Sequence, residues 1–205
     1  MKQQFQQVLQ TYRERAAAER TLLEAGGPAF FARRDELLLE IGEEVARVLQ
    51  SLIIARGAKH LVEVGTSYGF STLFLAAAAC EVGGHLVTFE LDAEKQAHAR
   101  EQITKAGLGE YVTWQCGDAV ELLAEVEEGI DFVLIDLWKD LYVPCLEILH
   151  PKLAQGAIVA ADNILRPESA RADAEAYRAA VRAKPDLQTI LLPIGSGIEL
   201  SCVWR

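Results

Sequence analysis

A short glycine turn between two apolar runs constrains this chain more than any other feature. Residues 61–71 read LVEVGTSYGFS, so an apolar run leads into two closely spaced glycines and a helix-like segment, and a second apolar run ends in Phe89-Glu90. A buried strand, a glycine turn that opens a helix and an acid ending the next strand are typical of a nucleoside pocket, where the acid accepts hydrogen bonds from ribose. The turn therefore predicts a nucleoside-binding α/β fold.

The residues of this turn narrow the choice of nucleoside. A pyrophosphate-binding fingerprint would have glycines where Ser67 and Phe70 stand, and a triphosphate loop would end in Gly-Lys-Ser/Thr, which the sequence does not contain. S-adenosylmethionine has a ribose and an adenine but no phosphate, so it is the cofactor that we expect. The alternative is a strand, turn and helix that bind no ligand.

Composition favours one enzyme-sized domain with a small-molecule substrate. A chain of 205 residues with 51% hydrophobic content can bury a full central sheet, and its net charge of −10 argues against a general nucleic-acid binder. We expect a single domain over 1–205, with a helical lid or dimerisation segment at 1–58 and a cofactor- and metal-binding core at 59–205. Four scattered cysteines, and no apolar stretch of the roughly 18 residues that span a membrane, predict a cytoplasmic protein without a membrane partner.

Apolar periodicity predicts two N-terminal helices followed by a doubly wound sheet. Helical spacing covers residues 5–12 and 37–52, and Gly26-Gly27-Pro28 predicts a break between them. Beyond residue 59, strand-sized runs alternate with helical segments, which is typical of a parallel sheet with helices on both faces. The last two runs are joined by only five residues, so they form an antiparallel pair. The predicted strands are 60–64, 85–90, 111–116, 131–135, 157–161, 187–192 and 198–203.

Polar residues follow several of these strands, at the edge where α/β sheets bind ligands. Glu90 is placed to bind ribose, and Asp118 to accept from the adenine amine. Asp136, Asp162 and Asn163 bring two carboxylates and one amide oxygen to neighbouring strand ends, and three oxygen ligands without His or Cys favour Mg²⁺ or a similar ion. The alternative is that both aspartates cap the helices that follow them.

Lys139 stands three residues after Asp136. A lysine beside a divalent cation has its charged form disfavoured, so it can serve as a base. It would remove the proton from an acceptor hydroxyl bound to the metal, and the hydroxyl oxygen would then attack the sulfonium methyl group. The alternative is an ordinary surface lysine paired with Asp140.

Together these motifs resemble the cation-dependent class I O-methyltransferases, the family that contains catechol O-methyltransferase. The resemblance runs from about residue 37 to the C-terminus. It implies a Rossmann-like, seven-stranded sheet in the order 3-2-1-4-5-7-6 with strand 7 antiparallel. The matching pieces are VEVGTSYGFS at 62–71, FE at 89–90, GDA at 117–119, LIDLWKDLY at 134–142 and AADNIL at 160–165.

The resemblance also implies roles for individual residues. Ser71 would bind the cofactor carboxylate at a helix start. Trp138 and Pro167 would form apolar walls around a flat aromatic substrate, and Glu199 would hold its second hydroxyl, although alternation around Glu199 also fits a half-exposed strand. The implied cofactor residues are Glu63, Gly65, Thr66, Ser67, Gly69, Ser71, Glu90, Gly117, Asp118 and Asp136; the metal ligands are Asp136, Asp162 and Asn163; the catalytic residues are Lys139 and Asp136.

The sequence thus predicts an S-adenosylmethionine-dependent O-methyltransferase that uses Mg²⁺ or another divalent cation and a small catechol-like acceptor. Two alternatives stay open. One is a tRNA hydroxynucleoside methyltransferase of the same fold, with phosphates bound by Arg171, Arg178 and Arg182. The other is a non-catalytic nucleoside-binding module that serves a partner protein.

The region before residue 33 shows no residue pattern that we can align with the motifs of this family. Tyr12, Phe30 and Phe31 are candidates for lid aromatics or for packing between helices. The broad apolar faces of the N-terminal helices predict a homodimer.

Overall fold

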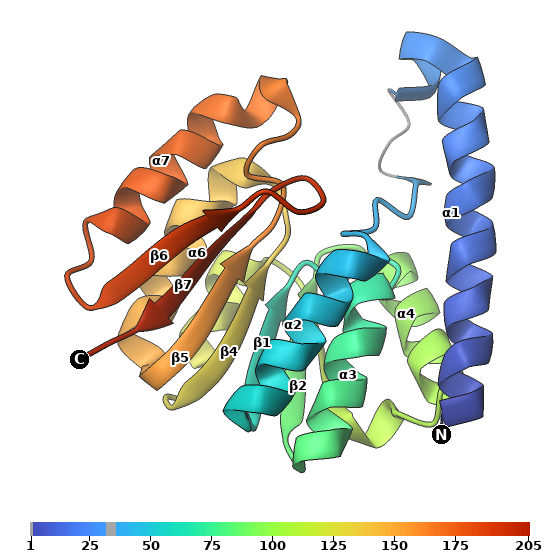
Figure 1. The fold of residues 1–205 in the computed structure, drawn as a ribbon. Helices are drawn as coiled ribbons and strands as arrows, with labels where there is room; N and C mark the ends of the chain where they lie inside the picture. Colours follow the sequence, from blue (N-terminus) through green and yellow to red (C-terminus); the bar gives the residue numbers. More distant parts are fainter. Residues whose placement is uncertain (1, 32–35) are drawn as a thin grey trace.

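One twisted sheet organises the chain (Figure 1). The computed structural model describes the backbone of residues 2–31 and 36–205, and the side chains of residues 2–22 and 36–205. Its seven strands lie in the order β3-β2-β1-β4-β5-β7-β6, with β7 antiparallel to both neighbours, so the Rossmann-like fold predicted from the sequence is confirmed. The strands are β1 His60–Val64, β2 His85–Glu90, β3 Val112–Cys116, β4 Ile130–Ile135, β5 Leu153–Ala161, β6 Leu187–Leu192 and β7 Ile198–Val203.

Helices cover both faces of the sheet and bury two separate cores. Side chains of α1 to α4 share one core, and those of α5 to α7 share the other. None of the described helices combines the length and apolarity that crossing a membrane requires. The helices are α1 Lys2–Phe31, α2 Glu43–Arg56, α3 Phe70–Val82, α4 Ala93–Lys105, α5 Ala119–Leu122, α6 Tyr142–Leu149 and α7 Arg171–Arg182, with 3-10 turns η2 Gly109–Tyr111, η3 Leu123–Glu125, η4 Lys139–Leu141, η5 His150–Lys152 and η6 Glu168–Ala170.

The last four residues of the central strand β4 are all apolar and buried. Phe132 and Leu134 enter the core beneath α1 to α4, whereas Val133 and Ile135 enter the core beneath α5 to α7. Because both faces of a parallel sheet are covered, successive residues are all buried and the usual polar alternation disappears.

Helix α1 differs from the sequence prediction, because it runs through Gly26-Gly27-Pro28, where we expected a break. A proline removes one N–H and crowds one carbonyl, and a helix already propagating over many turns can absorb this local loss. Near its start, Val8, Leu9 and Tyr12 are buried against the core. In Figure 1 the helix stands beside α4 and extends beyond it.

Residues 36–42, called the N-terminal strap here, lead into α2. The sequence predicted a helix from residue 37, but α2 begins at Glu43, after Gly42 at φ 87°. Leu37, Leu38 and Ile41 are buried although they are not helical. Their spacing imitates a helix although the strap is not helical, and the positive φ of Gly42 ends any helical continuation towards the strap.

Candidate active site

Several loops meet at the carboxyl edge of the sheet, because pairing brings the last residues of neighbouring strands into register. Gly65 follows β1, Asp136 follows β4 and Asp162 follows β5, so the three residues lie on adjacent strand ends. The Asp136 N–H donates to the Val64 carbonyl at 2.8 Å, and the Asp162 N–H donates to the Ile135 carbonyl at 3.1 Å. Backbone hydrogen bonds therefore hold the predicted site residues side by side.

The glycine turn after β1 is shaped by a close approach between two loops. Gly65 lies at φ 103°, and a Cβ atom there would be 2.0 Å from the carbonyl oxygen of Asp136, so only glycine fits. Two residues on, the Ser67 N–H donates to Oε2 of Glu90 at 2.6 Å. The Asp92 N–H donates to Oε1 of the same carboxylate at 2.9 Å. Glu90 is thus held at the end of β2 with lone pairs left for further donors.

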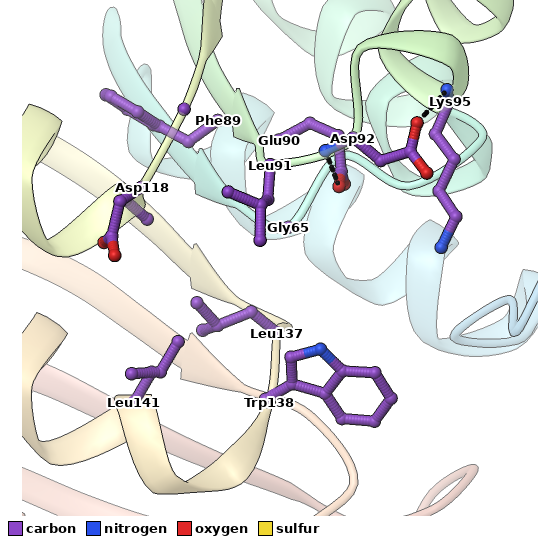
Figure 2. A pocket seen from close by; sticks show the side chains of 12 residues that line it. Gly65, Phe89, Glu90, Leu91, Asp92, Lys95, Asp118, Leu137, Trp138 and Leu141 are labelled. Atoms are coloured by element: carbon purple, nitrogen blue, oxygen red, sulfur yellow. Dashed lines mark hydrogen bonds between the residues drawn. The ribbon is translucent and has the colours of Figure 1, made fainter. Parts of the chain in front are cut away.

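A pocket of about 250 Å³ opens beside Glu90 (Figure 2). Figure 2 shows Glu90, Leu91 and Lys95 on one side of the pocket, opposite Leu137 and Trp138 on the other. Trp138 itself is 49% exposed to solvent. The remaining lining residues are Phe89, Asp92, Gly65, Gly117, Asp118, Ala119 and Leu141.

Of the predicted cofactor residues, four line this pocket: Gly65, Glu90, Gly117 and Asp118. The Asp118 carboxylate also accepts from the Val120 N–H at 2.8 Å and so caps α5. One oxygen of Asp118 therefore already has a partner, which leaves its predicted contact with adenine to the lone pairs that remain.

Other predicted cofactor residues lie beneath the pocket in a buried hydrogen-bond network. Ser71 and Thr72 donate to opposite oxygens of Glu63, each at 2.6 Å, and Thr88 donates to the second of them at 2.7 Å. Burial raises the pKa of Glu63 to about 7, although the three hydroxyl donors oppose this shift. The Thr66 hydroxyl pairs with that of Thr88 at 2.6 Å. This network fixes the start of α3 to β1 and β2.

The two aspartates at the centre of the edge do not cap helices. Asp162 is 1% exposed, and both of its carboxylate oxygens are buried without a hydrogen-bond partner among the described residues. The 3-10 turn after Asp136 has Trp138 at its N-cap, without a side-chain cap bond. The capping alternative is therefore wrong for Asp162 and finds no support at Asp136.

Lys139 lies beside these carboxylates rather than at the surface. Its Nζ donates to the Tyr142 hydroxyl at 2.6 Å, to Oδ1 of Asn163 at 3.0 Å and to the Leu137 carbonyl at 3.3 Å. The alternative of a surface lysine paired with Asp140 is wrong. Burial lowers the pKa of Lys139, and the nearby carboxylates Asp136 and Asp162 only partly counter this effect.

The charges at this edge suit a cation. Burial and, to a smaller extent, the negative charge of Asp136 raise the pKa of Asp162 to about 8, with the Asn163 backbone N–H and Lys139 opposing. Burial likewise raises the pKa of Asp136. Two clustered carboxylates, one of them with no donor, form an environment that a divalent ion would complete, and the Asn163 amide oxygen adds a neutral ligand of the kind that Mg²⁺ accepts. The described residues contain no cluster of three or more His, Cys, Asp or Glu that would hold a metal, so this set depends on the amide.

Two residues that sequence reasoning missed complete the neighbourhood. The buried Tyr142 hydroxyl accepts from Lys139 and donates to the Asp162 carbonyl at 3.1 Å, so it ties the lysine to the aspartate loop. Glu40, in the N-terminal strap, is half-buried, and its charge contributes to the raised pKa of Asp162. The spacing of Lys139 and Tyr142, one helical turn apart, was a signal for the first; nothing local signals the second.

Glu199 has a different environment from the one predicted. It is fully buried, accepts from Arg178 Nε at 2.8 Å and from the Thr189 hydroxyl at 3.0 Å, and does not line the described pocket. To contact substrate as predicted, the Glu199 carboxylate would have to give up part of its buried ion pair with Arg178. Pro167 stands at the N-cap of η6, exposed, outside the same pocket lining.

The arginines proposed for RNA binding are paired with carboxylates. Arg178 bonds to Glu199, and Arg182 approaches the same carboxylate at 3.7 Å. Arg171 bridges Glu168 and Glu175 at 2.9 and 3.0 Å. The RNA alternative thus lacks a set of unpaired arginines on α7.

Among the predicted lid aromatics, Tyr12 packs in the core and is 2% exposed. The side chains of Phe30 and Phe31 lie outside the described residues.

The sheet order, the antiparallel seventh strand and the pocket at the ends of β1 and β2 define the class of Rossmann-like methyltransferases. Within that class, the model of the family described as O-methyltransferase matches residues 16–203, and the chain belongs to this family. The sequence resemblance to O-methyltransferases is thereby confirmed.

Relatives and solved structures agree with this assignment. The chain is 32% identical over 154 residues to catechol O-methyltransferase of Niastella koreensis, covering 73% of this chain and 65% of the relative. It is 31% identical over 146 residues to catechol O-methyltransferase of Mycobacterium tuberculosis, covering 68% of this chain and 66% of the relative. The O-methyltransferase from Bacillus cereus in complex with SAH superimposes with a TM-score of 0.77 at 25% identity, covering 98% of this chain and 90% of that one. The chain spans just under two thirds of the Niastella relative and 54% of catechol O-methyltransferase B of Danio rerio.

Proposed function

We propose that this protein is an S-adenosylmethionine-dependent O-methyltransferase that requires a divalent cation and methylates one hydroxyl of a small catechol-like aromatic. The Asp162 carboxylate carries the proposal, because it is buried beside Asp136, Asn163 and Lys139 with neither oxygen hydrogen-bonded among the described residues. An isolated buried carboxylate is costly unless it is protonated or meets a cation. Membership of the O-methyltransferase family supports the reaction type.

In the proposed reaction Asp136, Asp162 and Asn163 hold the cation. When bound, such an ion lowers the pKa of a hydroxyl near it. Lys139 takes the hydroxyl proton on Nζ, and its lowered pKa increases the fraction of neutral amine that can do so. The acceptor oxygen forms a bond to the methyl carbon as the bond from carbon to sulfur breaks, which leaves S-adenosylhomocysteine and a methyl ether. Tyr142 and Asn163 keep Nζ in place throughout.

The donor side of the proposal uses the pocket beside Glu90. Glu90 accepts from the ribose hydroxyls, while Gly117 and Asp118 lie at the adenine. The methionine end of S-adenosylmethionine lies against the turn formed by Gly65, Thr66, Ser67 and Gly69. Glu63 and Ser71 lie beneath this turn. Trp138, at the edge of this pocket, limits water access and offers a flat apolar wall to an aromatic acceptor. The neighbour from Bacillus cereus, solved with SAH, supports this cofactor.

Cytoplasmic location and a homodimer also remain proposals. The four cysteines, all within the described residues, form no disulfide, which suits a reducing compartment. The dimer prediction has less support than the sequence suggested, because Val8, Leu9 and Tyr12 of α1 pack within the same chain, while Leu22 is 52% exposed. Light scattering on the purified protein tests the dimer directly.

The proposed function is tested with methyl-labelled S-adenosylmethionine and a panel of catechols, with and without EDTA, read by mass spectrometry. We expect a labelled monomethyl ether that disappears with EDTA and returns with excess Mg²⁺. Undiminished turnover in EDTA would refute the cation requirement. Cofactor binding without transfer to any phenol would favour the non-catalytic module, and salt-sensitive transfer to tRNA would favour the RNA enzyme.

A further inference from the structure

The glycine turn of the donor site is held from outside by helix α1. The Tyr12 hydroxyl donates to the carbonyl oxygen of Tyr68, within the turn, at 2.7 Å. The guanidinium carbon of Arg15 lies 3.7 Å from the centroid of the Tyr68 ring. Tyr12 and Arg15, which are one helical turn apart on α1, therefore contact the backbone and the side chain of Tyr68, respectively.

Arg15 also connects the contact with Tyr68 to the N-terminal strap. Its Nε bonds to Oε1 of Glu19 at 2.7 Å, and its second nitrogen donates to the Glu36 carbonyl at 3.1 Å. Oε2 of Glu19 accepts from the Leu38 N–H at 2.7 Å. A planar guanidinium can stack on a ring and donate in its own plane at the same time, which a lysine ammonium cannot do.

The Tyr68 ring also meets α4. His98 lies edge-on to it, with ring centroids 5.5 Å apart, and Lys95 Nζ lies 5.6 Å from its centroid. Lys95 lines the pocket beside Glu90. Tyr68 thus sits where α1, α4 and the donor pocket meet.

The turn needs external support because Ser67 adopts φ 48°, which costs a non-glycine residue about 1 kcal/mol. In this conformation the Ser67 N–H reaches Glu90 at 2.6 Å. A shift of the adjacent Tyr68 would move this N–H and release the carboxylate.

We propose that Arg15 is a positioning residue for the methyl donor: by clamping Tyr68 it sets the Ser67 and Glu90 geometry, and it links occupancy of the donor pocket to order in the N-terminal strap. This inference rests on the proposed function, because it takes S-adenosylmethionine as the occupant. Arg15 acts through Tyr68 and does not itself line the pocket.

The matched control is Arg13, two residues before Arg15 on α1. Arg13 pairs with Glu43 of α2 at 2.8 Å, so Arg13→Ala removes an α1 ion pair without altering the contact with Tyr68. Titration calorimetry of the intact protein measures S-adenosylhomocysteine affinity. We expect Arg15→Ala to weaken it about tenfold, within the range of a partly desolvated cation–π contact, and Arg13→Ala to leave it unchanged.

Two further measurements distinguish the proposed positioning role of Arg15 from a purely structural role. The KM for S-adenosylmethionine should rise in Arg15→Ala while kcat at saturating cofactor persists, and Arg15→Lys should restore part of the loss. By hydrogen exchange, S-adenosylhomocysteine should protect residues 66–69 and 36–42 in the unaltered protein but only 66–69 in Arg15→Ala.

Equal affinity and equal strap protection in Arg15→Ala and Arg13→Ala would overturn the clamp alone. If Arg15→Ala does not fold, Arg15→Lys provides the same comparison, and affinity equal to that of the unaltered protein overturns the clamp. Absence of S-adenosylhomocysteine binding by the unaltered protein would refute the donor site and the clamp together.

Discussion

Asp162→Asn should stabilise the protein when no divalent cation is present, although it removes a proposed ligand. The carboxyl has a pKa of about 8 in the folded state against an ordinary value of 3.8, mainly because it is buried beside Asp136; the Asn163 backbone N–H and Lys139 oppose the shift only in part. Because the folded pKa is the higher one, the stabilising contribution is complete below pH 3.8 and is lost as the pH rises through about 8. Near neutral pH the folded carboxyl is therefore mostly protonated while the unfolded one is ionised, so folding must take up a proton. An uncharged amide avoids this cost.

The magnitude follows from linkage. Each pKa unit corresponds to about 1.4 kcal/mol, so the interval between 3.8 and pH 7 sets an upper limit of about 4 kcal/mol. Relaxation around Asp162 and its coupling to Asp136 reduce this, and we expect a gain of about 2 kcal/mol. For a chain of this length that corresponds to a rise in Tm of about 4–8 °C.

The assay is thermal unfolding in EDTA and in excess Mg²⁺ between pH 5 and pH 8. In EDTA, the advantage of Asp162→Asn should grow as the pH rises; in Mg²⁺, the unaltered protein should gain stability and the variant should not. Asp140→Asn, at an exposed position in η4 after the neighbouring strand β4, serves as the control and should change little. A variant no more stable than the unaltered protein in EDTA at pH 7.5 would refute the reasoning.

Three further predictions concern neighbouring residues. Lys139→Ala should lower kcat by about 10²–10⁴ while S-adenosylhomocysteine affinity, measured by calorimetry, persists; lost affinity would contradict the base role. Asp136→Ala should abolish turnover together with Mn²⁺ binding, monitored by electron paramagnetic resonance, and retained metal binding would contradict its role as a ligand. Gly65→Ala should destabilise the fold by about 2–3 kcal/mol in urea unfolding and abolish cofactor binding, because its Cβ would overlap the Asp136 carbonyl; an unaffected variant would contradict the close approach.

The elements whose signals are local were predictable from the sequence. Strands β1, β2, β6 and β7 have the predicted bounds, because their apolar runs end at glycines, charged residues or turns. The acids at the carboxyl edge were also predictable, since parallel strands place their ends together. The path of residues 36–42 was not, because Leu37 and Leu38 owe their burial to tertiary packing and not to a helix.

Long-range partners account for the rest of the site. Glu199 was placed at a substrate position by resemblance, but its environment depends on Arg178, which lies on a different element. Arg15 reaches Tyr68 across 53 positions in the chain, counted from 15 to 68, and its side chain shows no local sign of that contact. Charge and stacking between distant segments become visible only once the fold is known.

The division of the carboxyl edge has an evolutionary consequence. Residues proposed for the methyl donor follow β1, β2 and β3, whereas those proposed for the cation and acceptor follow β4 and β5, and α7 packs in a core distinct from that of α1 to α4. If the proposed function holds, changes in the loop at 164–170 or in α7 would alter acceptor choice while the residues proposed for the donor stay unchanged. Under the proposed function, duplicated copies of such a gene would diverge in the acceptor that they methylate before they diverge in the methyl donor.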